Sequence, residues 1–487
     1  MTRAIAGTLL TAQTATARKP FIKMLFTSKD GLTTRDLSTN SVAYGNRILF
    51  IDHVEEAYNE YAVVVLRNSD KLLPAIKGYW TEIGYGDITA TGNEYAGDGV
   101  NGGARACSRL WVKSQQTISA GGKLYTILEL EGMWAQMGET LIIKGTAPLY
   151  NDSPFTANTI YSILENIIET QLGWVLEAIG TQSDSIIDVL TPDFVLNEGE
   201  FEVASGIVYR LLRMTKCLLR PKPTLTFEVR YPLAADVVDL TFNSNSAPFF
   251  YKFTYRDIVH VPSRVIVYGN AGTDLKWTSS INGNVNDADS LAAYADLRGI
   301  WLAPNVTVQG NVDLLAAAVL SKIKAESVVG IGEVPHHCKI ELLDKVAFVD
   351  NRVSANTYPA DGTVRVNGLR HTVKSGQYRL QITLGGVSTT RDIARSVGLQ
   401  TIVFNDIEEK AVANLPPEVR LEAVAPGLWQ APVGWQPPQP VAEMRPATPE
   451  DIRQAEILNR LGVANLPPAP NPLQALWNRI RDVTRRR

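Results

Sequence analysis

Between about Arg47 and Lys144 the apolar and polar residues alternate with the short period of β-strands. The stretch RILFIDHVEEAYNEYAVVVLRN contains two runs rich in β-branched and aromatic residues, and Asn68-Ser69-Asp70 marks a turn after them. The stretch RLWVKSQQTISAGGKLYTILELEGMW contains two more runs around Gly121-Gly122, which indicates a hairpin. Closely spaced strands separated by turns are typical of a barrel or a sandwich.

After residue 150 the pattern changes to the helical period. NTIYSILENIIETQLG predicts an amphipathic helix that ends at Gly173, with an apolar face formed by Ile160, Ile163, Leu164, Ile167, Ile168 and Leu172. EVASGIVYRLLRMTK predicts a second helix, whose apolar face is Val203, Ile207, Val208, Leu211 and Leu212. Two short strands joined at Pro221–Pro223 follow it. DADSLAAYADLRGIW and NVDLLAAAVLSKIKAES predict two more helices, each with Asp or Asn near its start. Strands return from Lys339 to Gly386, so a mixed insert separates two β modules.

The stretch from Phe404 to Arg487 has a different composition. It contains 13 of the 26 prolines, a density that argues against a continuous packed domain. Two short helices are predicted within it. One begins at Thr448-Pro449 and ends at Gly462, and the other begins at Asn471-Pro472. The second helix has one apolar face, formed by Leu473, Leu476, Trp477, Ile480 and Val483.

The length, composition and charge of the chain indicate a globular protein with several domains. The chain has 487 residues, 45% hydrophobic and 20% charged, and its net charge of −3 does not favour binding to nucleic acid or to an anionic membrane. The three cysteines are widely spaced, which indicates no disulfide framework and fits a reducing cytoplasm. We expect no signal peptide at the apolar patch Ala4–Leu10, and no apolar run approaches the ~18 residues that a membrane-spanning helix needs.

The triplet His336-His337-Cys338 is the first candidate for chemistry. Side chains two residues apart on a strand share a face, so His336 and Cys338 would lie together with His337 on the opposite side. One histidine and one cysteine are half of a zinc site, and no local motif supplies the other half. We therefore expect a strand that starts at Pro335, with the histidines at its rim and Cys338 buried.

Other motifs also favour structural roles. Gly97–Gly102 matches the dinucleotide pattern G-x-G-x-x-G but lacks the helix that must follow, and Asn286–Ser290 is explained by a helix N-cap. The adjacent pair Glu55-Glu56 is no evidence for a glycosidase. Aromatic residues of the first β module could stack on sugars but are more often core or interface residues: Trp80, Tyr85, Trp111, Tyr125 and Trp134. The sequence predicts no catalytic residue, no cofactor-binding residue, no cofactor and no metal ligand.

The order of these segments resembles that of phage tail-tip and baseplate hub proteins. YNEYAVVVLRNSDKLLPAIKGYWTEIGYGD is similar to a strand and turn of their first barrel, and the hairpin around Gly121-Gly122 follows as it does there. The helix TIYSILENIIETQLG and the later CLLRPKPTLTFEVRYP resemble their helical region. VPHHCKIELLDKVAFVDNR, followed by the run that ends in LGG, resembles their second barrel. The similarity covers about Arg47–Gly386.

The resemblance implies a mainly β fold with an α+β insert. Two β-barrel, tail-tube-like modules would flank a mixed helical and β region, followed by a proline-rich extended C-terminal tail. The expected divisions are an N-terminal arm (1–40), a first barrel (41–150), a mixed insert (151–330), a second barrel segment (331–400) and the C-terminal extension with two short helices (401–487).

The implied role is structural and not enzymatic. As a homotrimer at the tail tip of the virion, assembled in the host cytoplasm, such a hub closes the tail tube and takes part in host attachment and genome ejection. Its partners would be distal tail or tail tube proteins, the tape-measure protein, and tail fibre or spike proteins. Direct nucleic-acid recognition and stable membrane insertion are not expected.

The C-terminal extension departs from relatives that continue into a lytic, peptidase or fibre domain. We expect it to dock a neighbouring tail protein through Leu473, Leu476, Trp477 and Ile480. Three alternatives remain open: a distal tail ring protein, a virion-associated cell-wall hydrolase, and a carbohydrate-binding adhesin that uses exposed aromatic residues.

Overall fold

The fold is known from a computed structural model of the chain. Of its two compact units, Met1–Phe404 and Asn405–Arg487, only the first contains residues that the structure describes. These are 3–15, 17–103, 105–120, 122–143, 158–180, 186–192, 201–231, 236–257, 261–270, 281–293, 296–303, 306–326, 328–351, 356–358, 365–374 and 377–385. No helix among them is both long enough and apolar enough to cross a membrane.

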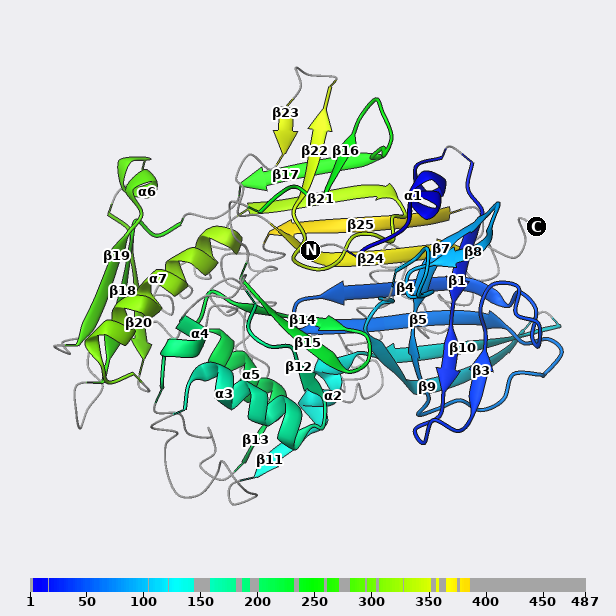
Figure 1. Cartoon of the computed structure of the whole chain (residues 1–487), viewed down its shortest axis with the longest axis horizontal. Coiled ribbons are helices and arrows are strands. Elements are labelled where there is room, and N and C mark those ends of the chain that lie inside the picture. Colours follow the sequence, from blue (N-terminus) through cyan, green and yellow to red (C-terminus); the bar gives the residue numbers. More distant parts are fainter. Residues whose placement is uncertain are drawn as a thin grey trace, which may run out of the picture. The chain divides into compact units, whose positions relative to one another are not determined.

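An eleven-stranded sheet is the centre of the fold, and its strands follow the order β17-β21-β25-β24-β4-β5-β10-β9-β6-β2-β3 (Figure 1). The strands contributed by the first third of the chain are β2 (Leu25–Thr27), β3 (Thr34–Asp36), β4 (Ile48–Glu56), β5 (Asn59–Arg67), β6 (Trp80–Glu82), β9 (Arg109–Ala120) and β10 (Lys123–Glu131). The strands from farther along are β17 (Lys252–Asp257), β21 (Val328–Pro335), β24 (Val366–Lys374) and β25 (Gln377–Gly385).

The two β modules meet in this sheet. β4 pairs antiparallel with β24, and His53 lies opposite His371 at the middle of the paired stretch. On one side β4, β5, β10 and β9 are successive antiparallel neighbours, and on the other side β24, β25, β21 and β17 are as well. We call these two sets of four strands the first and second half-sheets. The expectation of two separate barrels is thereby corrected: among the described strands they form one continuous, open sheet.

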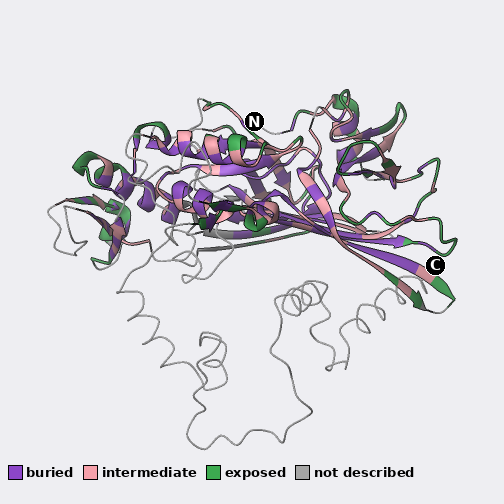
Figure 2. Cartoon of the chain, turned by 90° about the horizontal axis from the view of Figure 1, so that it is seen from below, coloured by how far each residue is buried: buried purple, intermediate pink, exposed green. Residues whose placement is uncertain are grey.

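Each half-sheet has its own small sheet and its own core. The first core contains Ile51, Val64 and Leu128 and is flanked by the sheet β1 (Pro20–Lys23), β7 (Gly84–Thr89) and β8 (Gly92–Tyr95). The second core contains Phe348 and Ile382 and includes the sheet β16 (Leu240–Asn243), β22 (Val346–Asp350) and β23 (Asn356–Tyr358). Figure 2 shows buried residues along the strands and exposed residues mainly at turns and strand ends.

The first forty residues contribute to the first core. They contain α1 (Gly7–Thr14) as well as β1, β2 and β3, and several of their side chains are fully or almost fully buried: Leu9, Phe21, Ile22, Met24, Phe26 and Leu37. The segment 1–40, expected as an arm, therefore packs into the first module over its described residues.

The insert forms a third core from helices and three small sheets. Its helices are α2 (Met133–Glu139), α3 (Ile160–Glu165) with the π-helical turn η1 (Asn166–Gln171), α4 (Ile186–Val189), α5 (Ala204–Leu212), α6 (Ala288–Ala293) and α7 (Gln309–Glu326). Its strands are β11 (Leu141–Ile143), β12 (Val175–Leu176), β13 (Phe201–Val203), β14 (Leu218–Lys222), β15 (Thr226–Arg230), β18 (Arg264–Gly269), β19 (Asn282–Asn286) and β20 (Arg298–Ala303). β11 pairs with β13, β12 and β14 flank β15, and β19 and β20 flank β18.

Several predicted elements are confirmed. The chain turns between β9 and β10 at the predicted hairpin, and β14 and β15 form the hairpin predicted around Pro221–Pro223. The helix predicted to stop at Gly173 does so: Gly173 has a φ of +68°, and the N–H of Trp174 bonds back to the carbonyl of Ile168 at 3.0 Å. All the predicted apolar residues of that helix are buried except Leu172, which is partly buried against the same core.

Other boundaries differ from the predictions. Val203 belongs to β13 and is 38% exposed, because the helix α5 begins one residue later. The stretch predicted as one helix over DADSLAAYADLRGIW divides into α6 and the strand β20, whose β-branched and aromatic residues pair with β18. Pro335 ends β21 instead of starting a strand. The proline-rich tail and its two predicted helices lie outside the described residues.

Candidate functional site: a buried polar seam

Where the half-sheets join, the inner face of the large sheet is polar. Ile51, His53 and Glu55 share one face of β4, since they are two residues apart, and His371 lies opposite His53 on β24. Nε2 of His371 is 2.6 Å from Oε1 of Glu55, and its Nδ1 is 2.8 Å from Nε2 of His336. We call the polar residues His53, Glu55, Tyr85, Cys107, His336 and His371 together the seam.

Aromatic rings enclose the histidines of the seam. Tyr85 from β7 stacks on His371 with 4.5 Å between ring centres and 4° between planes, and Tyr378 from β25 stacks on His336 at 4.2 Å and 4°. The hydroxyl of Tyr85 is 3.1 Å from Nδ1 of His53. The seam therefore joins residues from both half-sheets and from the small sheet of the first module.

Burial determines which seam residues carry charge. It lowers the pKa of His371 to about 4, although Glu55 acts in the opposite direction. It also lowers the pKa of His336 well below the ordinary value, and the nearby His371 and Arg18 add to this effect. Burial would raise the pKa of Glu55, but the hydrogen bond from His371 and nearby cationic groups, including Arg3, lower it to about 2. At neutral pH His336 and His371 are therefore uncharged, and the carboxylate of Glu55 is ionised.

Four side chains of the seam have a set of donor atoms that a metal ion could bind. They are His53 and Glu55 on β4, Cys107 in the loop before β9, and His371 on β24, and their ligand atoms all lie within 4.8 Å of one another. Sequence reasoning missed this group, because its members are up to 318 residues apart in number and belong to no local motif. The one available signal was the His-x-Glu spacing on β4, which places both side chains on one strand face.

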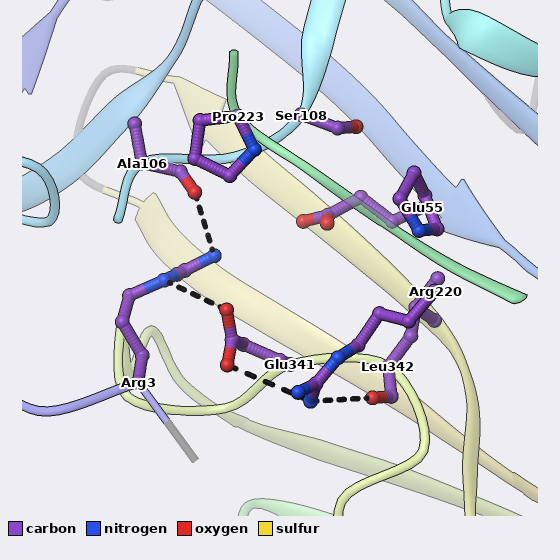
Figure 3. A pocket seen from close by; sticks show the side chains of 9 residues that line it. Arg3, Glu55, Ala106, Ser108, Arg220, Pro223, Glu341 and Leu342 are labelled. Atoms are coloured by element: carbon purple, nitrogen blue, oxygen red, sulfur yellow. Dashed lines mark hydrogen bonds and ion pairs between the residues drawn. The ribbon is translucent and has the colours of Figure 1, made fainter. Parts of the chain in front are cut away.

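A network of charged groups lies beside the seam, around a pocket lined by residues from the N-terminal segment, the insert and the second module (Figure 3). Nε of Arg3 is 3.5 Å from Glu341, and Arg220 of β14 reaches Glu341 at 3.6 Å, Asp344 at 3.4 Å and Glu228 at 2.5 Å. Burial and the charge of Glu341 raise the pKa of Asp344 to about 7, against the opposing effect of Arg220. The ion pairs of Arg220 with Glu341 and Asp344 connect the insert to the segment between β21 and β22 of the second module.

The triplet His336-His337-Cys338 lies just after the end of β21 and not in the predicted strand, but Cys338 and His337 still contact different cores. Cys338 belongs to the first core, whereas His337 lies edge-on to Phe242 of the second core, with 6.4 Å between ring centres. The prediction that Cys338 is buried is confirmed. The expectation that the histidines lie at a rim is wrong, because both are fully buried where the chain passes between the two cores.

The aromatic residues named as possible sugar-stacking groups pack against other side chains of the protein. The prediction that the aromatic residues are core or interface residues is confirmed for Tyr85, Tyr125 and Trp134, which are buried. Trp80 lies under the guanidinium of Arg109, and Trp111 faces Trp174.

The motif-based predictions have equally local explanations. The Gly97–Gly102 loop leads to β9 and not to a helix. The carboxylate of Asp287 caps α6 by accepting hydrogen bonds from the backbone N–H and the hydroxyl of Ser290. The predicted docking residues Leu473, Leu476, Trp477 and Ile480 lie outside the described residues.

The fold that these sheets define is one found in phage tail proteins. No protein-family model matches the chain, and no curated protein matches it. Among solved structures, it is similar to the tail protein from Neisseria meningitidis MC58, with a TM-score of 0.50 and 10% identity over 75% of this chain and 96% of that one. It is also similar to the 43 kDa tail protein of prophage MuSo2 from Shewanella oneidensis, with a TM-score of 0.50 and 10% identity over 76% of this chain and 98% of that one.

Proposed function

We propose that this chain is the structural hub of a phage tail tip or baseplate. The observation that carries the proposal is the paired architecture: next to the β4–β24 junction each module has four neighbouring antiparallel strands of one sheet, to which the first module adds β6, β2 and β3, and each module also has a three-stranded sheet of its own. Each half-sheet with its small sheet would take the place of one of the two barrels that the resemblance implies. The likeness to two phage tail proteins, over nearly their whole length, supports this assignment.

The paired architecture also suggests how the chain assembles. A chain with two similar half-sheets presents six of them when three copies surround one axis. Such a homotrimer matches the six-fold symmetry of a tail tube to a three-fold tip. The polar seam fits this role, since it joins the two halves through buried contacts and fixes their spacing within each chain.

The proposed hub works by binding other proteins and not by catalysis. It closes the tube at the tail tip of the virion and contacts distal tail or tube proteins, the tape-measure protein, and fibre or spike proteins. In this position it contributes to host attachment and genome ejection. It is assembled in the host cytoplasm and neither reads nucleic acid directly nor inserts stably into a membrane.

The mass of the purified full chain in solution tests this proposal. Light scattering should give three times the chain mass of 53.4 kDa, and negative-stain class averages should show a ring with pseudo-six-fold features. A true hexamer would contradict the hub and favour a distal tail ring protein. A monomer that persists at high protein concentration would contradict the trimer and direct the search to cell-wall hydrolysis or glycan binding.

A further inference from the structure

We propose that His53, Glu55, Cys107 and His371 bind one structural zinc ion inside the seam. The four side chains come from three segments, β4, the loop before β9 and β24, so that the ion would join the two half-sheets. All four are buried, with exposed fractions of 0%, 6%, 1% and 1%. This proposal does not depend on the tail-hub assignment.

The donor set is of the kind that zinc prefers. Zn²⁺ binds thiolate, imidazole and carboxylate groups in a tetrahedral arrangement with bonds of about 2.0–2.3 Å, which places the ligand atoms roughly 3.3–3.8 Å from one another. Sγ of Cys107 is already 3.5 Å from Oε1 of Glu55, and every pair of ligand atoms is within 4.8 Å. Small side-chain movements would complete the tetrahedron. Because the protein supplies all four ligands, the site would be structural and not catalytic.

An unpartnered nitrogen supplies independent support. Nδ1 of His53 is 3.1 Å from the hydroxyl of Tyr85, but Nε2 has no hydrogen-bond partner although the residue is 0% exposed. The carboxylate nearest to that Nε2 is Glu60, whose Oε1 is 3.6 Å away. A buried polar atom without a partner costs about 1–3 kcal/mol, so such atoms in folded proteins call for a specific explanation. Zinc coordination would satisfy this nitrogen.

A supporting hydrogen bond would hold the second imidazole in place. When Nε2 of a histidine binds a metal, its other nitrogen usually donates to a nearby acceptor that fixes the ring. Nδ1 of His371 is 2.8 Å from Nε2 of His336, which is itself stacked on Tyr378. In the zinc-bound form the two ligand imidazoles, His53 and His371, are neutral and carry their protons on Nδ1. Nδ1 of His371 then donates a hydrogen bond to Nε2 of His336.

The charges of the site also balance. A zinc ion bound by one thiolate, one carboxylate and two neutral imidazoles has no net charge, which suits a buried position. Binding releases the thiol proton of Cys107. The nearby cation, Arg3, has its own partners, because it pairs with Glu341 at 3.5 Å and donates to the carbonyl of Cys338 at 2.6 Å.

Elemental analysis of the full chain, expressed with added zinc and dialysed, tests the site. We expect one zinc per chain, a lower melting temperature after removal of the metal by a chelator, and recovery when zinc alone is added back. Protein loaded with cobalt should show the absorption band of a thiolate bound to cobalt. Folded wild-type protein that binds less than a tenth of one zinc per chain would overturn the proposal.

Two cysteine variants identify the ligand. Cys107→Ser should lose the zinc and the cobalt–thiolate band, whereas Cys338→Ser, a buried cysteine of the same core, should retain both. Full zinc content in Cys107→Ser would also overturn the assignment. If Cys107→Ser does not fold, the cobalt spectra of the wild type and of Cys338→Ser still test the site. The proposal requires the cobalt–thiolate band in both proteins, and its absence from either would contradict it.

Discussion

At the residue scale, buried polar side chains connect the parts of this molecule. Glu55 joins His371 across the β4–β24 pair, and Arg220 joins the insert to Glu341 and Asp344 of the second module. A buried ion pair such as that of Arg220 with Glu341 adds little net stability when compared with apolar packing, but breaking it leaves a buried charge uncompensated. Such residues therefore define one relative position of the parts they connect.

Asp344 should make the stability of the protein fall as pH rises from about 4 to about 7. Its pKa is about 7 in the folded chain and 3.8 ordinarily, so the folded state binds this proton more tightly than the unfolded state does. The resulting stabilisation is complete below the unfolded pKa and is lost as pH rises through the folded pKa. Each pKa unit of difference corresponds to about 1.4 kcal/mol.

The check is the melting temperature of wild type and Asp344→Asn at pH 5 and at pH 8. The variant keeps a carbonyl oxygen that can accept from the backbone N–H of Glu341 but cannot ionise. Relative to the variant, the wild type should be more stable at pH 5 than at pH 8. An equal difference at both pH values would show that Asp344 does not titrate as described.

The surroundings of a side chain could be predicted from the sequence only where they depend on residues close to it along the chain. In the triplet His336-His337-Cys338, His337 contacts a different core from Cys338, as expected, but the strand on which that expectation was based ends at Pro335. The burial of these histidines was not predictable, because Tyr85, Tyr378 and His371 reach them from strands distant in sequence. The donor set of the seam depends likewise on the pairing of β4 with β24.

At the element scale, close packing between sheets depends on glycine in β21. The large and small sheets of the second module meet where Phe348 of β22 stacks on Phe253 of β17 at 4.3 Å. A Cβ atom added to Gly332 would lie 2.3 Å from the Phe348 ring. This contact explains why a strand of the core has no side chain at this position.

Gly332→Ala should destabilise the protein by about 1–3 kcal/mol, because the added methyl group must displace a ring that packs on both sheets. Gly330→Ala is the matched control. It is on the same strand and the same face, and the atoms nearest to its Cβ would be those of the Leu384 side chain, at 3.3 Å or more, in place of a ring at 2.3 Å. Chemical denaturation of both variants measures the effect. Equal losses of unfolding free energy would contradict the role given to Phe348.

Most elements were predictable because their signals are local. The hairpin between β9 and β10 and the helix stop at Gly173 depend on residues a few positions apart. The strand β20 could not be predicted, because its apolar residues directly follow a helical stretch. Only the pairing with β18 decides its conformation. The first forty residues form strands for a similar reason: β1 pairs with β7, far along the chain.

At the scale of the whole molecule, local patterns could not show that two modules share one sheet. Each module has the alternation of a self-contained β domain, and among the described strands the pairing of β4 with β24 is what makes their sheets continuous. A strand at the border of a predicted barrel has the same pattern whether it pairs within its own module or with another. The sequence therefore predicted that each module consists of β-strands, but not that the strands of the two modules form one sheet.

The C-terminal extension should act at this scale by docking a neighbouring tail protein. Replacing Leu473, Leu476, Trp477 and Ile480 with serine removes most of the apolar face of the last predicted helix, all but Val483, and leaves its length and its terminal arginines. Tails assembled with this variant should contain less of one neighbouring tail protein, as measured by quantitative mass spectrometry. Deleting Leu473–Arg487 should have the same effect, and the melting temperature of the purified chain should be unchanged in both.

The matched control replaces polar residues on the opposite face of the same predicted helix, Gln474, Asn478 and Asp482, with serine. Loss of the neighbour in both sets of variants would point to the helix itself and not to its apolar face. Unchanged tail composition in the apolar-face variant and in the deletion would contradict the docking role. The predicted helix would be short and polar on its other side, so it could bury its apolar face only against another surface.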